Sequence, residues 1–142
     1  MKVLVGMSGG VDSAVTAALA ARRNDASGIT LKLYDGNQDL LIKKFAQESG
    51  DAAEVCRKLG INHTVLDLKE DFYKLVIKYF IDEYIAGNTP NPCIQCNINI
   101  KFGAMLDYAQ KNGFDKIATW HYACIEKCGD KFLLKKALDG TK

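Results

Sequence analysis

The sequence contains no apolar run long enough to cross a lipid bilayer, no internal repeat and no low-complexity tract. The apolar stretch at its N-terminus is too short for a secretory signal peptide. We therefore expect a cytoplasmic protein without a membrane partner. Charge is nearly balanced, because 19 Lys and Arg residues accompany 17 Asp and Glu residues, a net charge of +2. Net charge alone therefore gives no reason to expect nucleic-acid binding.

Proline is scarce: the chain has two, and both lie in NTPNPCIQC, residues 88–96. This stretch is predicted to be a stiff loop between two helices. Without a secretory signal, the cysteines are not expected to form a disulfide framework. Reduced thiols, a metal site and redox chemistry remain as interpretations. The five cysteines are Cys56, Cys93, Cys96, Cys124 and Cys128.

Strand and helix patterns alternate along the chain, which predicts a single α/β domain over residues 1–142 with a parallel sheet and helices on both faces. Ligands of such sheets bind beyond the carboxyl ends of the strands. The polar segment 35–50 has no clear pattern and is expected to be mobile, and a hairpin is expected over 124–138, turning at Gly129 and Asp130. Strands are predicted at 2–7, 27–34, 63–68 and 116–122, and helices over 11–19, 52–59, 72–84 and 98–109.

The stretch GMSGGVDSAV, residues 6–15, places a glycine pair between the first strand and the first helix. Backbone N–H groups of such a loop bind anions, and Gly9 and Gly10 leave room for a phosphate. Ser8 and Ser13 offer hydroxyl groups, and Asp12 indicates either a bound Mg²⁺ or a helix cap. A missing lysine excludes a Walker A loop, and a missing third glycine excludes a dinucleotide fingerprint. The alternative is a tight turn without a ligand.

The pair Cys93 and Cys96 has three interpretations: a redox pair, half of a metal site, or a nucleophile with a helper. A helix expected to begin near Asn97 would lower the pKa of the Cys96 thiol and so activate it. An iron–sulfur cluster would use Cys93, Cys96 and a third cysteine. A structural zinc site would add Cys124 and Cys128 to the pair. The sequence alone assigns no metal ligand.

The motif SGGVDS, residues 8–13, resembles the signature of the PP-loop ATP pyrophosphatases, which cleave ATP to AMP and pyrophosphate. GMSGGVDSAV, TPNPCIQCNINIKFG and ATWHYA together resemble the N-terminal part of the tRNA-specific 2-thiouridylases, and the resemblance covers essentially the whole chain. It implies a doubly wound parallel sheet of the adenine nucleotide α-hydrolase type, with strand order 3-2-1-4-5. Family members are much longer, so we expect tRNA-binding and later domains, and a second catalytic cysteine, to lie outside residues 1–142.

The resemblance also implies a reaction. ATP, with Mg²⁺, adenylates the C2 carbonyl oxygen of the wobble uridine 34 of a tRNA and so activates C2. A cysteine persulfide, charged by a sulfur-relay protein, then delivers sulfur to C2. Cys96 matches the catalytic cysteine. Asn91, Pro92 and Cys93 match the stretch that meets the target base. The ATP site matches Gly6, Met7, Ser8, Gly9, Gly10, Val11, Asp12, Ser13, Leu31 and Trp120.

Trp120 departs from the family text ATGHYA, in which a glycine stands at its position. Its ring would stack on a base, block the nucleotide or pack in the core. His121 and His63 are expected to be structural. Two other functions stay open. One is a PP-loop enzyme that adenylates a small carboxylate or amide and needs no thiol, and the other is an inactive nucleotide-binding or scaffold module.

Overall fold

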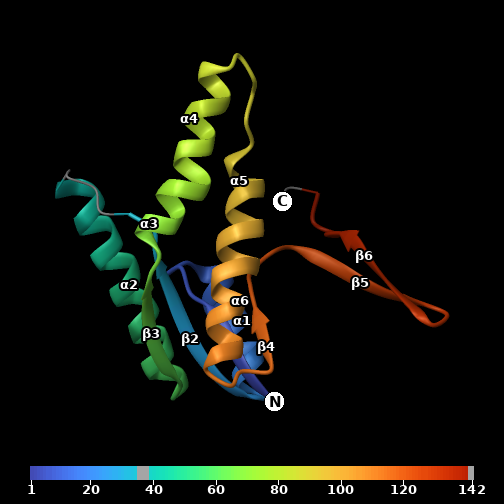
Figure 1. The fold of residues 1–142 in the computed structure, drawn as a ribbon. Coiled ribbons are helices and arrows are strands. Elements are labelled where there is room, and N and C mark those ends of the chain that lie inside the picture. Colours follow the sequence, from blue (N-terminus) through green and yellow to red (C-terminus); the bar gives the residue numbers. More distant parts are fainter. Residues whose placement is uncertain (35–38, 141–142) are drawn as a thin grey trace.

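The computed structural model describes residues 1–34 and 39–140, without the side chains of residues 39–45. Four parallel strands form one sheet in the order β3-β2-β1-β4 (Figure 1). In the central strand, Val5 pairs with Gly28 on one side and with Ala118 on the other. The carboxyl ends of β1, β2 and β4 therefore lie at one edge. The strands are β1 Lys2–Gly6, β2 Asp25–Lys32, β3 Asn62–Asp67 and β4 Lys116–Ala118.

Helices cover both faces of this sheet because β1 buries alternate residues on opposite sides. Val3 and Val5 pack in one cluster with α1 and α2, whereas Leu4 packs in another with α6. A continuous apolar run is what such a doubly covered strand requires. On the first face lie α1 Val11–Ala21 and α2 Asp39–Leu59. The connection from β3 to β4 consists of α3 Lys69–Phe72, η1 Tyr73–Ile77, α4 Lys78–Ile85, α5 Pro92–Gln95, η2 Cys96–Ala104 and α6 Met105–Lys111.

The helical elements of this connection form two continuous rods, residues 69–85 and residues 92–111. Each rod contains a π-helical segment, η1 in the first and η2 in the second. A π-helix bonds each carbonyl to an N–H five residues on and is wider than an α-helix. In η2, a Cβ at Gly103 would lie 2.9 Å from the carbonyl oxygen of Ile98, five residues earlier. Glycine at position 103 therefore lets that wider turn close.

The predicted strands are all present, but the fourth ends at Ala118 instead of Tyr122. The order 3-2-1-4 agrees with the expected fold, and the fifth strand of that order is absent from the residues that the structure describes. Instead β5 Ala123–Cys128 pairs antiparallel with β6 Lys131–Lys136. The expected turn at Gly129, with a φ of 60°, allows this pairing, so the hairpin prediction is confirmed.

Two segments contain more helix than the sequence indicated. Helix α2 begins at Asp39, so most of the segment 35–50 is helical, and 35–38 lie outside the described residues. The loop predicted at 88–96 ends at Asn91, because Pro92 suits a first helical position and the Asn91 side chain accepts a hydrogen bond from the N–H of Ile94 at 3.4 Å. The helix therefore begins five residues before Asn97, the expected start.

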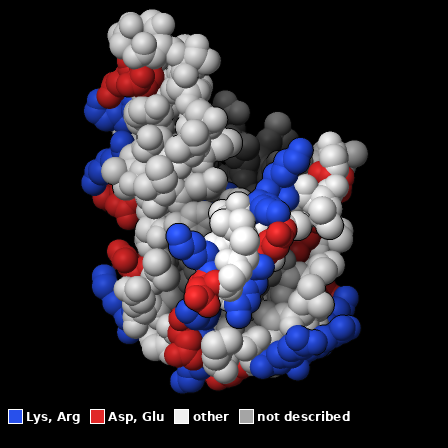
Figure 2. All heavy atoms as spheres, turned by 90° about the vertical axis from the view of Figure 1, so that its right-hand side faces the viewer, with Lys and Arg blue, Asp and Glu red and all other residues white. Residues whose placement is uncertain are grey.

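The end of the helical pair α4 and α5 projects beyond the sheet (Figure 1). No charged residue occurs between Glu83 and Lys101, and Figure 2 shows this end as a largely uncharged surface. Charges of both signs are interspersed over the middle of the same view, on the side of the β5–β6 hairpin. Within the ranges 1–34 and 39–140, no helix combines the length and apolar character needed to span a membrane.

Candidate functional site

The glycine loop joins β1 to α1 at the carboxyl edge of the sheet. Gly9 has a φ of +77°, and a Cβ there would lie 2.6 Å from the carbonyl oxygen of Glu48. Gly10 has an ordinary φ of −85°, and a Cβ there would meet Ser8 Oγ at 3.5 Å, a normal contact. The fold therefore requires glycine at position 9 but not at position 10. A bare backbone at position 10 is instead what close approach of a ligand would need.

Gly10 is the N-cap of α1 and supplies no side-chain cap, so the interpretation of Asp12 as the cap is wrong. The N–H groups of the first turn then point out of the helix without a capping side chain, which favours an anion. Ser13 is fully buried, and its Oγ accepts a hydrogen bond from the Ser8 N–H at 3.2 Å and donates one to the Gly10 carbonyl at 2.9 Å. Ser13 thus holds the loop together, and its contact with phosphate stays a prediction.

A cavity of about 170 Å³ opens between this loop and the ends of β2 and β4. Its walls are mostly apolar. It is smaller than the roughly 300 Å³ or more of a pocket for a whole drug-sized ligand, so it suits a planar base instead of a complete nucleotide. Among its lining residues are Gly6, Met7 and Ser8 from the loop, Leu31 from β2, Lys101 and Met105 from η2 and α6, and Trp120 after β4.

Trp120 forms one wall of this cavity. A Cβ at Gly6 would lie 2.9 Å from Cζ3 of the Trp120 ring, so the ring rests directly on the end of β1. Lys101 places its Nζ 5.6 Å from the ring centroid. The ring is half-buried, so it lines the cavity and is neither part of the core nor fully exposed. Stacking of a base on Trp120 remains a prediction that this position permits.

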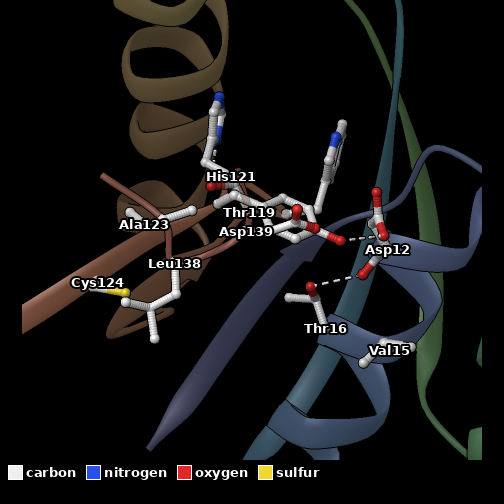
Figure 3. Close-up of a pocket in the computed structure, with 12 residues that line it drawn as sticks. Asp12, Val15, Thr16, Thr119, His121, Ala123, Cys124, Leu138 and Asp139 are labelled. Atoms are coloured by element: carbon white, nitrogen blue, oxygen red, sulfur yellow. Dashed lines mark hydrogen bonds between the residues drawn. The ribbon is translucent and has the colours of Figure 1, made fainter. Parts of the chain in front are cut away.

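A second cavity, of about 470 Å³, lies between α1 and the hairpin (Figure 3). Trp120 and Thr119 line both cavities. The hydroxyl of Tyr122 donates a hydrogen bond to Asp12 Oδ1 at 2.8 Å, and Thr16 Oγ1 donates one to the Asp12 carbonyl at 2.8 Å. Figure 3 marks both hydrogen bonds. The Asp12 carboxylate therefore lies at the junction of the loop and the larger cavity.

Cys96 lies in the second turn of its helix, which corrects the expectation that it directly precedes a helix start. Its side chain is half-buried and packs against a cluster of Leu68, Val76 and Ile100. Burial raises the pKa of the Cys96 thiol; Lys101 counteracts this rise, and Cys93 adds to it. The expected activation of Cys96 by a helix N-terminus is therefore wrong. Cys93, one turn earlier, is exposed.

His121 connects the end of β4 to the helix that carries Cys96. Its Nδ1 lies 2.8 Å from Thr119 Oγ1, and its Nε2 lies 3.2 Å from Asn97 Oδ1. The ring also contacts Phe102, with 5.4 Å between centroids. Burial, and then Lys101, lower the pKa of His121, which favours a neutral ring. These contacts fit the structural role expected for His121.

No three His, Cys, Asp or Glu side chains gather into a possible metal site among the described residues. All five cysteines are free, with Cys124 in the larger cavity and Cys128 exposed on the hairpin. The four-cysteine zinc hypothesis is therefore wrong for this part of the chain. The pair Cys93 and Cys96 likewise finds no third ligand there for an iron–sulfur cluster.

Sequence reasoning missed Lys101 and Tyr122. Lys101 comes four residues after Asn97 and eight after Cys93. Because residues four apart lie on one side of a helix, this spacing could have indicated that Lys101 shares a side of the helix with the cysteine motif. Asn97 and Lys101 both reach the residues that follow β4, His121 and Trp120. Tyr122 carried no such signal, because its hydrogen bond to Asp12 joins residues 110 positions apart.

A family model described as "tRNA methyl transferase HUP domain" matches residues 1–142. The tRNA-specific 2-thiouridylase MnmA of Treponema denticola is 50% identical over 147 residues, which cover 100% of this chain and 40% of that relative. The tRNA-specific 2-thiouridylase MnmA of Desulforamulus reducens is 44% identical over 149 residues, covering 99% and 41%. The chain thus spans about two fifths of the length of these curated relatives.

Solved structures agree on the fold. The U34-tRNA thiolase NcsA from Methanococcus maripaludis, solved with its 4Fe-4S cluster, gives a TM-score of 0.53 at 21% identity and covers 86% of this chain and 39% of its own. A predicted subunit of tRNA methyltransferase from Methanocaldococcus jannaschii gives 0.56 at 18% identity, covering 86% and 53%. At such identities the likeness shows the fold alone.

Proposed function

This chain belongs to the tRNA methyl transferase HUP domain family, and from that membership we propose that it is the ATP-binding, adenylating part of a tRNA 2-thiouridylase. One observation carries the proposal. The uncapped glycine loop and the helix that bears Cys96 form two walls of the same base-sized cavity. A nucleotide bound there would lie against the helical segment that carries a thiol five residues before Lys101, a feature that an ATP site without sulfur chemistry does not need.

The proposed reaction has two stages. The C2 carbonyl oxygen of wobble uridine 34 attacks the α-phosphate of ATP, and pyrophosphate leaves. The terminal sulfur of a cysteine persulfide then attacks C2, and AMP leaves with the former carbonyl oxygen. The thiol of the other catalytic cysteine attacks the inner sulfur of the persulfide, so the S–S bond breaks, the terminal sulfur stays on C2 and a disulfide forms between the two cysteines. The residues of this chain bind the nucleotide and hold its α-phosphate beside the target base, so that the reacting groups meet in a fixed geometry.

The cavities suggest how the nucleotide is held. The base would lie in the smaller cavity between Leu31 and Trp120. The phosphates would lie on the N–H groups from Gly9 to Ser13, toward the larger cavity. The Asp12 carboxylate suits Mg²⁺, which prefers oxygen ligands, after exchanging its hydrogen bond from Tyr122. We assign no reaction step to the ion.

We propose that the uncharged projecting end, with Asn91, Pro92 and Cys93, meets the target base, and that Cys96 is the catalytic cysteine. A persulfide donor protein, the second cysteine and the domains that grip tRNA are assigned to the remaining length of the whole protein. A tRNA substrate and free thiols suit the cytoplasm. An iron–sulfur cluster would need a third ligand from outside the described residues, so no step is routed through it.

Calorimetric titration of the chain with ATP in Mg²⁺ tests nucleotide binding, and a folded chain that binds no ATP contradicts the proposal. The thiol is tested in the whole protein. A Cys96→Ser variant should bind ATP normally and form no 2-thiouridine in tRNA. Cys128→Ser, at an exposed cysteine on the hairpin, is the matched control and should keep the activity.

The same whole protein separates the two alternatives. ATP–pyrophosphate exchange that depends on a small carboxylate, and not on tRNA, would support the small-molecule adenylating enzyme. ATP binding without exchange under either condition would support an inactive module. The 2-thiouridylase requires exchange that depends on tRNA.

A further inference from the structure

Lys101 is a half-buried cation on the wall of the smaller cavity, which it shares with Gly6, Met7 and Ser8. It is the first charged residue after Glu83. In the part of the chain that the structure describes, its ammonium pairs with no carboxylate. Glu48, the other charged residue lining this cavity, forms no ion pair with it. Instead the ammonium lies over the Trp120 ring, 5.6 Å from the centroid.

This cation–π contact between Lys101 and Trp120 is a weak interaction. A cation over an aromatic face is attracted only by the quadrupole of the ring, whereas a hydrogen bond between an ammonium and a phosphate joins two full charges and is the stronger interaction. A phosphate arriving within reach would therefore draw the ammonium from the ring of Trp120. Lysine has a flexible stem that makes this movement easy.

The position of Lys101 also selects which phosphate it can meet. The smaller cavity holds a base, and the uncapped N–H groups of the loop lie beyond it. The phosphate closest to the base is the α-phosphate, which stays on the nucleoside through the whole proposed reaction. The charge of Lys101 also acts on Cys96 and His121, since it counteracts the raised pKa of Cys96 and adds to the lowered pKa of His121.

We propose that Lys101 is a substrate-binding residue that leaves the face of Trp120 and contacts the α-phosphate of the nucleotide. This inference rests on the proposed function, because it takes the smaller cavity as the base site. It adds a residue to the nucleotide site that the glycine loop alone does not reveal. It also means that the helix bearing Cys96 holds the nucleotide directly.

Calorimetry with ATP, AMP and adenosine tests this role. Lys101→Met should weaken ATP and AMP by about 10- to 100-fold, the range of a charged hydrogen bond, and should leave adenosine within about twofold. Lys101→Arg, which keeps the charge, should recover most of the affinity. Lys111→Met, at an exposed lysine near the end of the same rod, is the matched control and should bind all three ligands like the wild type.

Each other outcome has a defined meaning. Equal weakening of adenosine and ATP would overturn the inference, since Lys101 would then act only through the cavity wall. Unchanged ATP affinity in Lys101→Met would also overturn it. If Lys101→Met does not fold, Lys101→Gln provides the neutral variant for the same comparison. If the wild type binds none of the three ligands, the proposed function fails first and this inference fails with it.

Discussion

The ring of Trp120 rests on the backbone of Gly6, where a Cβ would lie only 2.9 Å from Trp120 Cζ3. Gly6 ends β1, and Trp120 follows β4, its neighbour in the sheet. The contact therefore joins two strand ends at the edge where the candidate site lies. It also couples the two positions: a side chain at position 6 and a large ring at position 120 exclude each other.

Gly6→Ala should therefore destabilise the protein by about 1–3 kcal/mol, the usual cost of overpacking. In the double variant Gly6→Ala/Trp120→Gly the added methyl group has room. The two changes should then be non-additive by about 1 kcal/mol or more in urea unfolding, as expected for residues in contact. Gly50→Ala, where a Cβ would meet nothing within 4 Å, is the control and should not lower stability. Additive effects would mean that the Trp120 ring simply moves aside.

The two loop glycines should respond differently to the same substitution. Gly9→Ala places a Cβ 2.6 Å from a backbone oxygen at positive φ, so we expect a loss of about 2 kcal/mol or more in the free energy of unfolding. Gly10→Ala should change stability by less than about 1 kcal/mol, since its φ is ordinary. Its methyl group should nevertheless weaken ATP binding by calorimetry. ATP affinity unaffected by Gly10→Ala would place the phosphates elsewhere.

The burial of Cys96 predicts slow alkylation. Only the thiolate reacts, and the raised pKa leaves less of it at pH 8. Iodoacetamide labelling, followed by mass spectrometry, should modify Cys96 several-fold more slowly than the exposed Cys128. The rate for Cys96 should also rise at higher pH than for an ordinary thiol, and at still higher pH in Lys101→Met. A midpoint below that of an ordinary thiol would show an activated Cys96.

Both histidines of the chain should make stability depend on pH in the same direction. Burial lowers the pKa of His63 and of His121 in the folded state, so the unfolded chain binds more protons as pH falls. Their contribution is present above the unfolded pKa of about 6.5 and is lost as pH falls below it. Urea unfolding between pH 7.5 and pH 5 should show this loss. His63→Gln and His121→Gln should each reduce the slope, and an unchanged slope in both would contradict the assignment.

The fold was predictable where the signal is local. The continuous apolar run from Val3 to Val5 indicated a strand that is covered on both faces. The helix start at Pro92 was missed because a proline-rich stretch suits both a loop and the first helical turn. The end of β4 was predicted too late because the residues after Ala118 keep a strand-like sequence pattern, although they leave the sheet and line the cavities of the candidate site.

Part of the candidate site was predictable for the same reason. Gly9 and Gly10 stood out in the sequence, although only the structure separates the glycine that the backbone requires from the one it does not. The burial of Cys96 could not be predicted from its neighbours in the sequence, because it comes from Leu68, just before α3, and from Val76 in η1. Lys101 and Tyr122 acquire their meaning only from contacts made across the sheet edge.

Gly103 also affects the direction of the helical segment that carries the two thiols. The rod from Pro92 to Lys111 is anchored to the sheet at one end through Met105 and Ala109, and presents Cys93 and Cys96 at the other. An unbroken α-helix would fix the angle between those ends by residue count alone. The wider π-helical turn, which Gly103 permits beside the carbonyl of Ile98, changes the angle between the two ends of the rod. The direction of the helical segment that carries Cys93 and Cys96 is thus set separately from the packing of Met105 and Ala109 that holds the other end of the rod on the sheet.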